Sequence, residues 1–276
     1  MYRANPEYLI LKKIANLVDL QDGTLVDIGA HDGLSGSCMF PFWKDETDKW
    51  NGLAVEIDSN RCNNMRQLYN DFNVNIVNEK VTPHNICNIL SSNNINSDFD
   101  MINIDIDSYD LDVARSMLDG GFKPKIITIE VNPIIPTPIY FEILYHPDHE
   151  HRANPFMGSS LTALADTIIP HGYILYEHWI GNAFFVREDI AKDKIPAMTV
   201  EEAYDIGWRK MPNWKEHFWY FELFRPWLDM SPEDAVKDID KVFKEIINGT
   251  SVHTNPSWPG KYWWDPKYIL EIRNKD

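Results

Sequence analysis

Short apolar runs alternate with amphipathic segments over roughly the first 190 residues of the chain. Five of these runs are four to six residues long, continuous and rich in Ile and Val, which is typical of strands buried on both faces of a parallel sheet. Two later runs are separated only by a short turn, so we expect an antiparallel pair at the far edge of the sheet. The predicted strands are Thr24–Ile28, Gly52–Ile57, Val74–Val77, Met101–Ile106, Ile126–Val131, Tyr173–Glu177 and Ala183–Val186.

Helical periodicity occurs between these runs. In the segment Asp110–Leu118, apolar residues recur at the spacing of one helix face, and Gly120 and Gly121 predict its end. The other predicted helices are Pro6–Val18, Ser159–Ile169 and, near the end of the chain, Val236–Ile247. Alternation of strands and helices predicts an α/β fold: a Rossmann-like, doubly wound, mostly parallel sheet with an antiparallel edge strand.

Composition changes after Asp189. Seven of the ten tryptophans lie in residues 190–276, together with the segment WKEHFWYFELFRPW and a turn-rich WPGKYWWDP sequence. We therefore predict two domains, with residues 1–189 forming the α/β domain and residues 190–276 a helical, Trp-rich extension packed on it. The extension could instead act as a lid or join copies of the chain into a homo-oligomer.

Charge and cysteine content narrow the range of partners. The chain has 26 Lys and Arg against 42 Asp and Glu, and residues 1–189 alone have 13 against 27. Such an acidic surface repels phosphate backbones and anionic lipids, which argues against nucleic-acid or membrane partners. The sequence has no apolar run of 18 residues and no signal-peptide pattern at its start, so we expect a cytoplasmic protein. Three unevenly spaced cysteines suit a reducing compartment.

A cluster of glycines follows the first predicted strand, in the sequence LVDIGAHDGLSGS. No lysine follows these glycines as a P-loop requires, and His31 stands where a dinucleotide-binding loop has its second glycine. What remains is an acidic residue, Asp27, followed by Gly29 and Gly33. This spacing resembles the first motif of S-adenosylmethionine (SAM)-dependent methyltransferases. A tight strand-to-helix turn without a ligand is the alternative.

The chemistry of SAM suits such a loop. Glycines let the backbone approach a ligand closely, N–H groups at a helix start can meet a carboxylate, and Asp27 can face an ammonium group. Glu56 ends the second predicted strand, where an acidic side chain can accept hydrogen bonds from both ribose hydroxyls. Asp58 is a neighbouring rival for that role. His31 could lean over the cofactor or lie on the surface.

Four oxygen-bearing side chains lie at the C-terminal ends of the fourth and fifth predicted strands. Asp105 and Asp107 lie at the end of one strand, and Glu130 and Asn132 at the end of the next. Ligands of open α/β sheets bind at this edge, and oxygen donors suit Mg²⁺ or another hard cation. We therefore predict a metal site made by these four residues, with Asp105 also close to the cofactor. Helix caps and polar strand ends are the alternative.

Several segments in order resemble the FkbM-type SAM-dependent methyltransferases: VDIGAHDG, VEID, DMINIDIDSYDLDVARSM, KPKIITIEVN and GSSLTALADTIIPHGYILYEHWIGNAFFVRED. The resemblance covers about residues 20–190 and implies a Rossmann-like fold, SAM as cofactor and methyl transfer. The segment DIDSYD is also similar to one in metal-dependent sugar O-methyltransferases. Those enzymes usually have a later Asp-Asp pair, whereas this chain has Glu130-Val131-Asn132.

A hydroxyl acceptor has to lose its proton during methyl transfer, so a base is needed. The candidates are Asp107 and two histidines, His146 and His149, in the segment HPDHEHR. A solvated polar loop is the alternative for the histidines, and zinc is less suited because no cysteine accompanies them.

These observations predict a SAM-dependent methyltransferase, an O-methyltransferase acting on a hydroxyl of a sugar or small molecule. The proposed cofactor-binding residues are Asp27, Gly29, His31, Gly33, Glu56 and Asp105. The rival hypotheses are a nucleotide- or NAD-using enzyme on the same fold, and a non-catalytic binding module.

Overall fold

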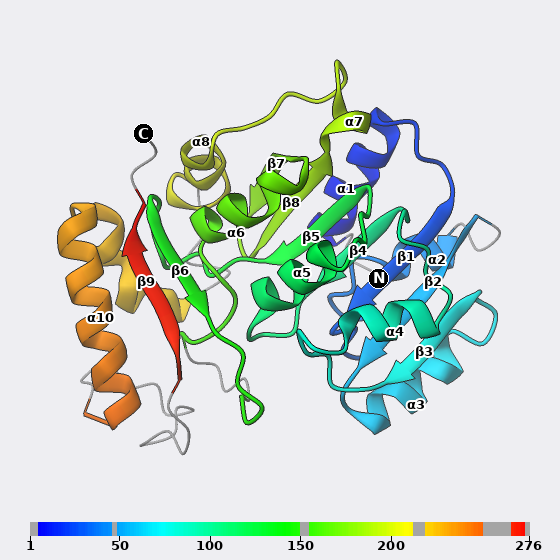
Figure 1. Ribbon diagram of the computed structural model, residues 1–276, viewed down its shortest axis with the longest axis horizontal. Coiled ribbons are helices and arrows are strands. Elements are labelled where there is room, and N and C mark those ends of the chain that lie inside the picture. The colour runs from blue at the N-terminus through cyan, green and yellow to red at the C-terminus, as the bar shows by residue number, and fades with distance from the viewer. Residues whose placement is uncertain (1–4, 46–48, 150–154, 212–218, 251–265, 274–276) are drawn as a thin grey trace.

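A seven-stranded sheet with the order β3-β2-β1-β4-β5-β8-β7 forms the centre of the molecule (Figure 1). The computed structural model describes residues 5–45, 49–149, 155–211, 219–250 and 266–273. Strand β8 runs antiparallel to both of its neighbours, β5 and β7, and the remaining pairs are parallel. The strands are β1 (Gly23–Ile28), β2 (Trp50–Glu56), β3 (Val74–Asn78), β4 (Met101–Ile104), β5 (Ile126–Glu130), β7 (Tyr173–Trp179) and β8 (Asn182–Arg187).

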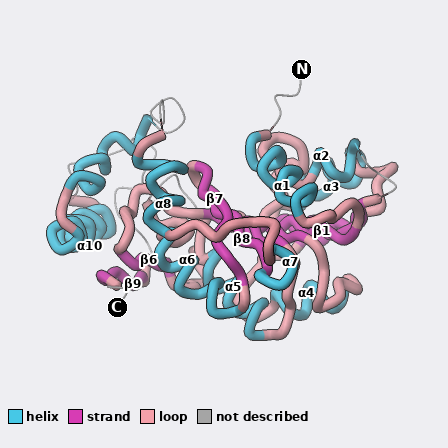
Figure 2. Tube along the Cα trace, turned by 90° about the horizontal axis from the view of Figure 1, so that it is seen from above, coloured by secondary structure: helices cyan, strands magenta, loops and turns pink. Residues whose placement is uncertain are grey.

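Helices cover both faces of this sheet (Figure 2). Side chains alternate along each strand, so Val26 and Ile28 of β1 belong to one buried apolar cluster and Leu25 to a second. Helices α1, α2 and α3 pack on the face of Leu25, and α4, α5 and α6 pack on the other. Their bounds are α1 (Pro6–Leu17), α2 (Phe40–Asp45), α3 (Ser59–Leu68), α4 (Ile86–Ser92), α5 (Asp110–Asp119) and α6 (Leu161–Ile168).

The predicted fold class is confirmed. The four predicted helices are present with small shifts at their ends, and the last two strands of the sheet form the expected antiparallel pair at its far edge. Within that pair the antiparallel strand β8 lies inside and β7 is outermost. Strand β4 ends at Ile104, two residues earlier than predicted, so Asp105 belongs to the loop that follows.

A second, two-stranded sheet was not predicted. It pairs β6 (Ile139–Ile143) with β9 (Tyr268–Ile272) in antiparallel register. Strand β6 is inserted between β5 and α6, so the end of the described chain is joined to the middle of the α/β part. The small sheet and α10 (Pro232–Asn248) lie together at the left of Figure 1.

The 3₁₀ helix η1 (Ile169–His171) precedes β7. Most of the described chain after β8 is helical, beginning with α7 (Glu188–Ala191). Next come α8 (Val200–Tyr204), the π-helix η2 (Asp205–Arg209) and the 3₁₀ helix η3 (Trp219–Asp229). The helical nature of the extension is thus confirmed. The WPGKYWWDP segment, apart from its last residue, lies outside the described residues, and nothing tests the predicted domain boundary or oligomer.

Within the described part of the chain, every helix is too short or too polar to cross a bilayer. The cytoplasmic location stays a prediction.

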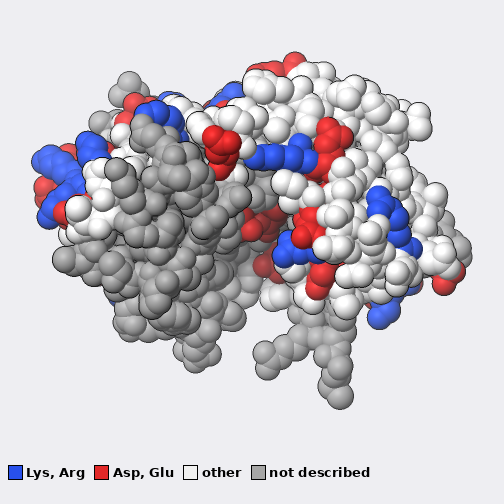
Figure 3. Space-filling view, turned by 90° about the horizontal axis from the view of Figure 1, so that it is seen from below, with Lys and Arg blue, Asp and Glu red and all other residues white. Residues whose placement is uncertain are grey.

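Acidic side chains gather around a central hollow on the face shown in Figure 3, with some basic side chains beside them. All three cysteines are free thiols.

Candidate active site

A cavity of about 660 Å³ opens at the carboxyl ends of β1, β2 and β4. The chain runs from β1 outward to β3, then returns to β4 on the other side of β1, so the crevice between β1 and β4 is the topological switch point of the sheet. Open α/β sheets bind ligands at such a point. The cavity volume is in the usual range for sites that hold a cofactor or small molecule.

Asp27, the next-to-last residue of β1, lines this cavity. Its side chain is buried, and its carboxylate accepts hydrogen bonds from Ser37 Oγ at 2.8 Å and Asn103 Nδ2 at 2.9 Å. Burial raises the pKa of Asp27. Each oxygen retains a lone pair after these bonds, so the carboxylate can still accept from a ligand.

Two of the predicted glycines have different reasons to be glycine. Gly29 has a φ of +82°, and a Cβ there would lie 1.8 Å from the carbonyl oxygen of Asp105, so only glycine lets β1's loop pass the end of β4. Gly33, with a φ of +69°, packs instead against Met65 and Tyr69. Gly29 lines the cavity, whereas Gly33 lies outside its lining and shapes the turn.

Glu56, the last residue of β2, is held in place at the cavity by backbone donors. Its Oε2 accepts from the N–H of His31 at 3.0 Å, and its Oε1 accepts from the N–H of Asp58 at 2.8 Å. Asp58 itself caps helix α3 and is not part of the cavity lining, so of these two rivals Glu56 is the one that lines the cavity. His31 also lines the cavity, but its side chain is 56% exposed at the rim.

Two further cavity residues were not predicted from the sequence. Ile57 is 61% exposed although it is a large apolar side chain, and it lines the cavity directly after Glu56. Asn103 lies inside β4 and reaches the carboxylate of Asp27. A polar residue in an otherwise apolar strand was the available signal for Asn103, and an apolar residue beyond a strand end was the signal for Ile57.

A cluster of three carboxylates lies beside the cavity. One oxygen each from Asp105, Asp110 and Glu130 lies within 4.8 Å of the others. Asp105 lines the cavity, while Asp110 and Glu130 are buried behind it. In the described part of the chain, Glu130 Oε2 has no hydrogen-bond partner. Three oxygens at this spacing are a donor set that suits a hard divalent cation.

Burial and mutual proximity raise the pKa values of all three carboxyl groups. Burial raises the pKa of Asp105 and of Glu130 well above their ordinary values, and repulsion from neighbouring carboxylates adds to this. The pKa of Asp110 is raised to about 7, again mainly by burial. Its carboxylate also accepts from the backbone N–H groups of Ile106 and Ser108, which opposes the rise. The cluster therefore favours either protons or a cation.

The cluster differs from the four predicted metal ligands. Asp105 and Glu130 belong to it, but Asp110 takes part in place of Asp107 and Asn132. Asp107, with a φ of +54°, lines the cavity instead. Asn132 is fully buried, and its Nδ2 donates to the carbonyls of Pro155 and Met157 at 2.9 and 3.0 Å.

The two predicted histidines are separated by the fold. His149 is 5% exposed and lines the cavity on the side of β3. His146 is outside the cavity lining, and its Nδ1 accepts from the N–H of Asp148 at 3.1 Å. Of the proposed bases, Asp107 and His149 therefore have access to a bound ligand.

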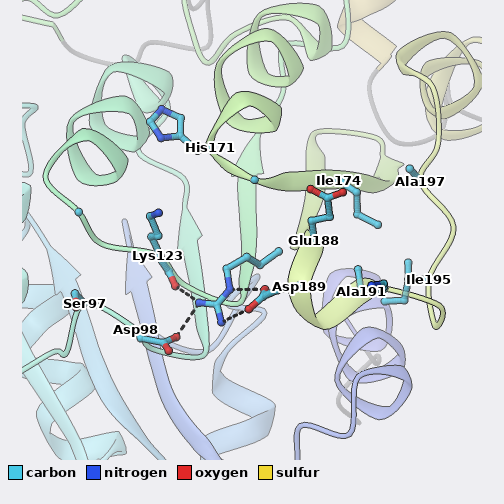
Figure 4. A pocket seen from close by; sticks show the side chains of 14 residues that line it. Ser97, Asp98, Lys123, His171, Ile174, Glu188, Asp189, Ala191, Ile195 and Ala197 are labelled. Atoms are coloured by element: carbon cyan, nitrogen blue, oxygen red, sulfur yellow. Dashed lines mark hydrogen bonds and ion pairs between the residues drawn. The ribbon is translucent and has the colours of Figure 1, made fainter.

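A larger hollow of about 990 Å³ lies at the opposite, amino-terminal edge of the strands (Figure 4). Arg187 lines it and forms ion pairs with Asp98 and with both oxygens of Asp189. Its guanidinium also donates to the carbonyl of Lys123. The charge of the Arg187 guanidinium is thus already neutralised by carboxylates. The hollow also lies at the edge of the sheet opposite the switch point. We therefore assign the functional site to the smaller cavity.

No family model matches the sequence. No curated protein matches it either. Among solved structures, the chain is similar to a SAM-dependent methyltransferase from Aquifex aeolicus, with 15% identity, TM-score 0.38, and coverage of 66% of this chain and 92% of that one. It is also similar to one from Clostridium acetobutylicum (10% identity, TM-score 0.41, coverage 68% and 92%). The case for a function therefore rests on the chain's own cavity, and the FkbM resemblance stays a prediction.

Proposed function

We propose that this protein is a SAM-dependent methyltransferase that transfers the methyl group to a hydroxyl of a sugar or small molecule. The observation that carries the proposal is the cavity at the switch point, which is lined by the backbone of Gly29 and by two acidic side chains, Asp27 and Glu56. This combination suits a ligand with an ammonium, a ribose and no phosphate.

The cavity offers each part of SAM a suitable surface. Asp27 can face the ammonium group, and Glu56 keeps acceptor capacity for the ribose hydroxyls after its two backbone bonds. Ile57 offers an exposed apolar side chain beside Glu56, where a base can lie. SAM, when bound, supplies a methyl group on a positively charged sulfur.

Methyl transfer to a hydroxyl forms a C–O bond and breaks a C–S bond, and the hydroxyl proton must go to a base. The chain's main task is to align the acceptor oxygen with the methyl group and exclude water. Asp107 lines the cavity and is the side chain that we propose to take the proton.

We further propose that Asp105, Asp110 and Glu130 can hold a divalent cation next to the acceptor. These residues suit a cation because one oxygen of each lies within 4.8 Å of the others. In addition, Glu130 Oε2 has no hydrogen-bond partner among the described residues. A bound cation would lower the pKa of an acceptor hydroxyl.

Calorimetric titration with SAM, with S-adenosylhomocysteine and with NAD⁺ tests the proposal. We expect the first two to bind and Glu56→Ala to weaken both by roughly tenfold or more, the loss of about two hydrogen bonds to ribose. The matched control is Glu188→Ala, which removes a carboxylate that lines the larger hollow at the opposite edge of the sheet. Binding of NAD⁺ alone would favour an NAD-using enzyme instead.

Turnover separates an enzyme from a non-catalytic module. We expect methylated product from a panel of sugars and small alcohols with SAM, and loss of activity after treatment with EDTA if the cation takes part. Tight SAM binding without product from any acceptor would favour a binding module.

A further inference from the structure

The loop Leu144–His149, which follows β6, is fastened over one end of the cavity. Lys80 Nζ, beyond the end of β3, donates to the carbonyl oxygen of Pro147. The N–H of Tyr145 donates to Asp112 Oδ2 at 2.9 Å, which ties the loop to α5. These bonds hold the loop against two elements of the α/β part.

Aromatic side chains pack where this loop meets the cavity. The ring of Tyr109 is perpendicular to the ring of Tyr145 at 4.8 Å and to that of His149 at 5.9 Å, measured between centroids. Tyr109 is itself fixed, because its hydroxyl donates to the carbonyl of Val81 at 3.0 Å. His149, Tyr109 and Val81 all line the cavity, so together they make a continuous wall.

The order of the strands decides which part of a ligand meets this wall. Asp27 and Gly29 follow β1, Glu56 ends β2, and Val81 lies just beyond β3, the next strand outward. A ligand with its amino-acid end at β1 and its ribose at Glu56 extends its base toward β3. This step depends on the proposed function, because it takes SAM as the ligand.

We propose that His149, with Tyr109 and Val81, forms the wall of a nucleobase pocket, and that His149 contacts the base of the cofactor and is not the base for methyl transfer. The sequence predicts His149 as a base in a polar loop, but its ring is buried against Tyr109 on the β3 side and is suited to contact with a flat heterocycle. The loop then sets specificity for the nucleoside.

The test uses two probes, S-adenosylhomocysteine and 5′-methylthioadenosine, of which the second has the nucleoside but no amino-acid end. We expect His149→Ala to weaken both by roughly fivefold or more, since contact between an aromatic ring and a base is worth about 1 kcal/mol or more. His149→Phe, which keeps a flat ring, is expected to bind both probes more tightly than His149→Ala does. His146→Ala, in the same loop but outside the cavity lining, is the matched control.

Each result of this experiment has a definite meaning. Equal affinity of wild type and His149→Ala for methylthioadenosine would overturn the proposal. A pH–rate profile in which His149→Phe loses one of the two limbs seen in wild type would also overturn it, because His149 would then be acting as an acid or base. If His149→Ala does not fold by circular dichroism, the comparison of His149→Gln with His149→Phe replaces it, and equal binding by these two would count against an aromatic wall. Failure of wild type to bind either probe would overturn the proposed function and this inference together, whereas normal wild-type binding with an unaffected His149→Ala would overturn the inference alone.

Discussion

The backbone N–H of His31 donates to the carboxylate of Glu56 across a gap of 25 residues in the sequence. This bond joins the glycine loop after β1 to the end of β2. A second N–H, from Asp58, occupies the other oxygen. The carboxylate that we assign to the ribose is therefore also a brace between the two loops that frame the cavity.

Glu56→Gln is expected to lower stability as well as ligand affinity. The amide keeps one acceptor oxygen, but its NH₂ group must face either the N–H of His31 or that of Asp58, and the abandoned donor costs about 1–3 kcal/mol. The measurement is the urea-unfolding free energy without ligand. Glu79→Gln is the control, because Glu79 is exposed and accepts from the side chain of Asn85. Equal stability of both variants would contradict a bracing role for Glu56.

Gly29→Ala is expected to be severely destabilising, by roughly 3 kcal/mol or more, because its Cβ would meet the Asp105 carbonyl in a left-handed conformation. Two other glycines separate the effect of the steric clash from that of the left-handed backbone conformation. Gly36→Ala has open space but a φ of +96°, and should cost about 1–2 kcal/mol. Gly181→Ala has open space and an ordinary φ, and should change stability by less than about 0.5 kcal/mol. Chemical denaturation of the three variants gives the ranking, and any other order would exclude the clash as the cause.

The carboxylate cluster predicts that the cation-free protein loses stability as pH rises. Asp110 has its pKa raised to about 7 in the folded state, above its unfolded value, so the folded state binds the extra proton. Stability from such a group is present at low pH and is lost as pH rises through about 7. Thermal unfolding in EDTA should therefore show a lower melting temperature at pH 8 than at pH 6.5. Burial lowers the pKa of His178 to about 4, so the folded state keeps this ring neutral over the range, and its contribution to stability rises slightly with pH and opposes the fall.

Asp110→Asn should flatten that dependence, since the amide oxygen can still accept a backbone N–H but has no proton to lose. A melting temperature that falls as steeply in the variant as in wild type would assign the effect to other groups.

Divalent cation should reverse the loss at pH 8. A cation that binds only the folded cluster stabilises it by about 2.7 kcal/mol at a concentration one hundred times its dissociation constant. The measurement is the melting temperature with Mg²⁺ and with Mn²⁺, and Glu130→Gln is the variant expected to respond less. The absence of any shift with either ion would remove the cation from the proposed mechanism.

Arg115 of α5 forms an ion pair at 2.7 Å with Glu142 of β6, which is 1% exposed and also accepts from the hydroxyl of Tyr140. Arg115→Met leaves a buried carboxylate without its cation and is expected to cost about 2–3 kcal/mol. Arg115→Met combined with Glu142→Gln should cost less than the sum of the two single changes. Additive costs in this cycle, measured by urea unfolding, would mean that the pair is not coupled.

The sequence was sufficient for the central sheet because burial on both faces leaves a clear mark. Runs such as LVDI and MINI are apolar apart from one residue each, and a glycine or carboxylate residue follows directly after them. Parallel strands bring their carboxyl ends to one edge, so Asp27, Glu56 and Asp105 could be grouped without any knowledge of contacts. Their shared cavity follows from topology.

The remaining parts depend on contacts that a local pattern does not encode. Asp110 is the first residue of a helix, where an acidic residue is common, so the sequence does not indicate that its carboxylate lies beside Glu130. His146 and His149 are three residues apart in a polar loop, and only the turn of that loop directs one into the cavity and the other away from it. Strands β6 and β9 are short and distant in sequence, so neither run indicates its partner.

The pairing of β6 with β9 also has a consequence for how the chain is made. Residues 139–143 are synthesised long before residues 268–272, and until the latter emerge from the ribosome, the edge of β6 that β9 later covers has exposed amide and carbonyl groups. Closing a loop of this length is slow compared with local folding. Nascent protein therefore passes through a period in which that edge of β6 is open to pairing with another strand.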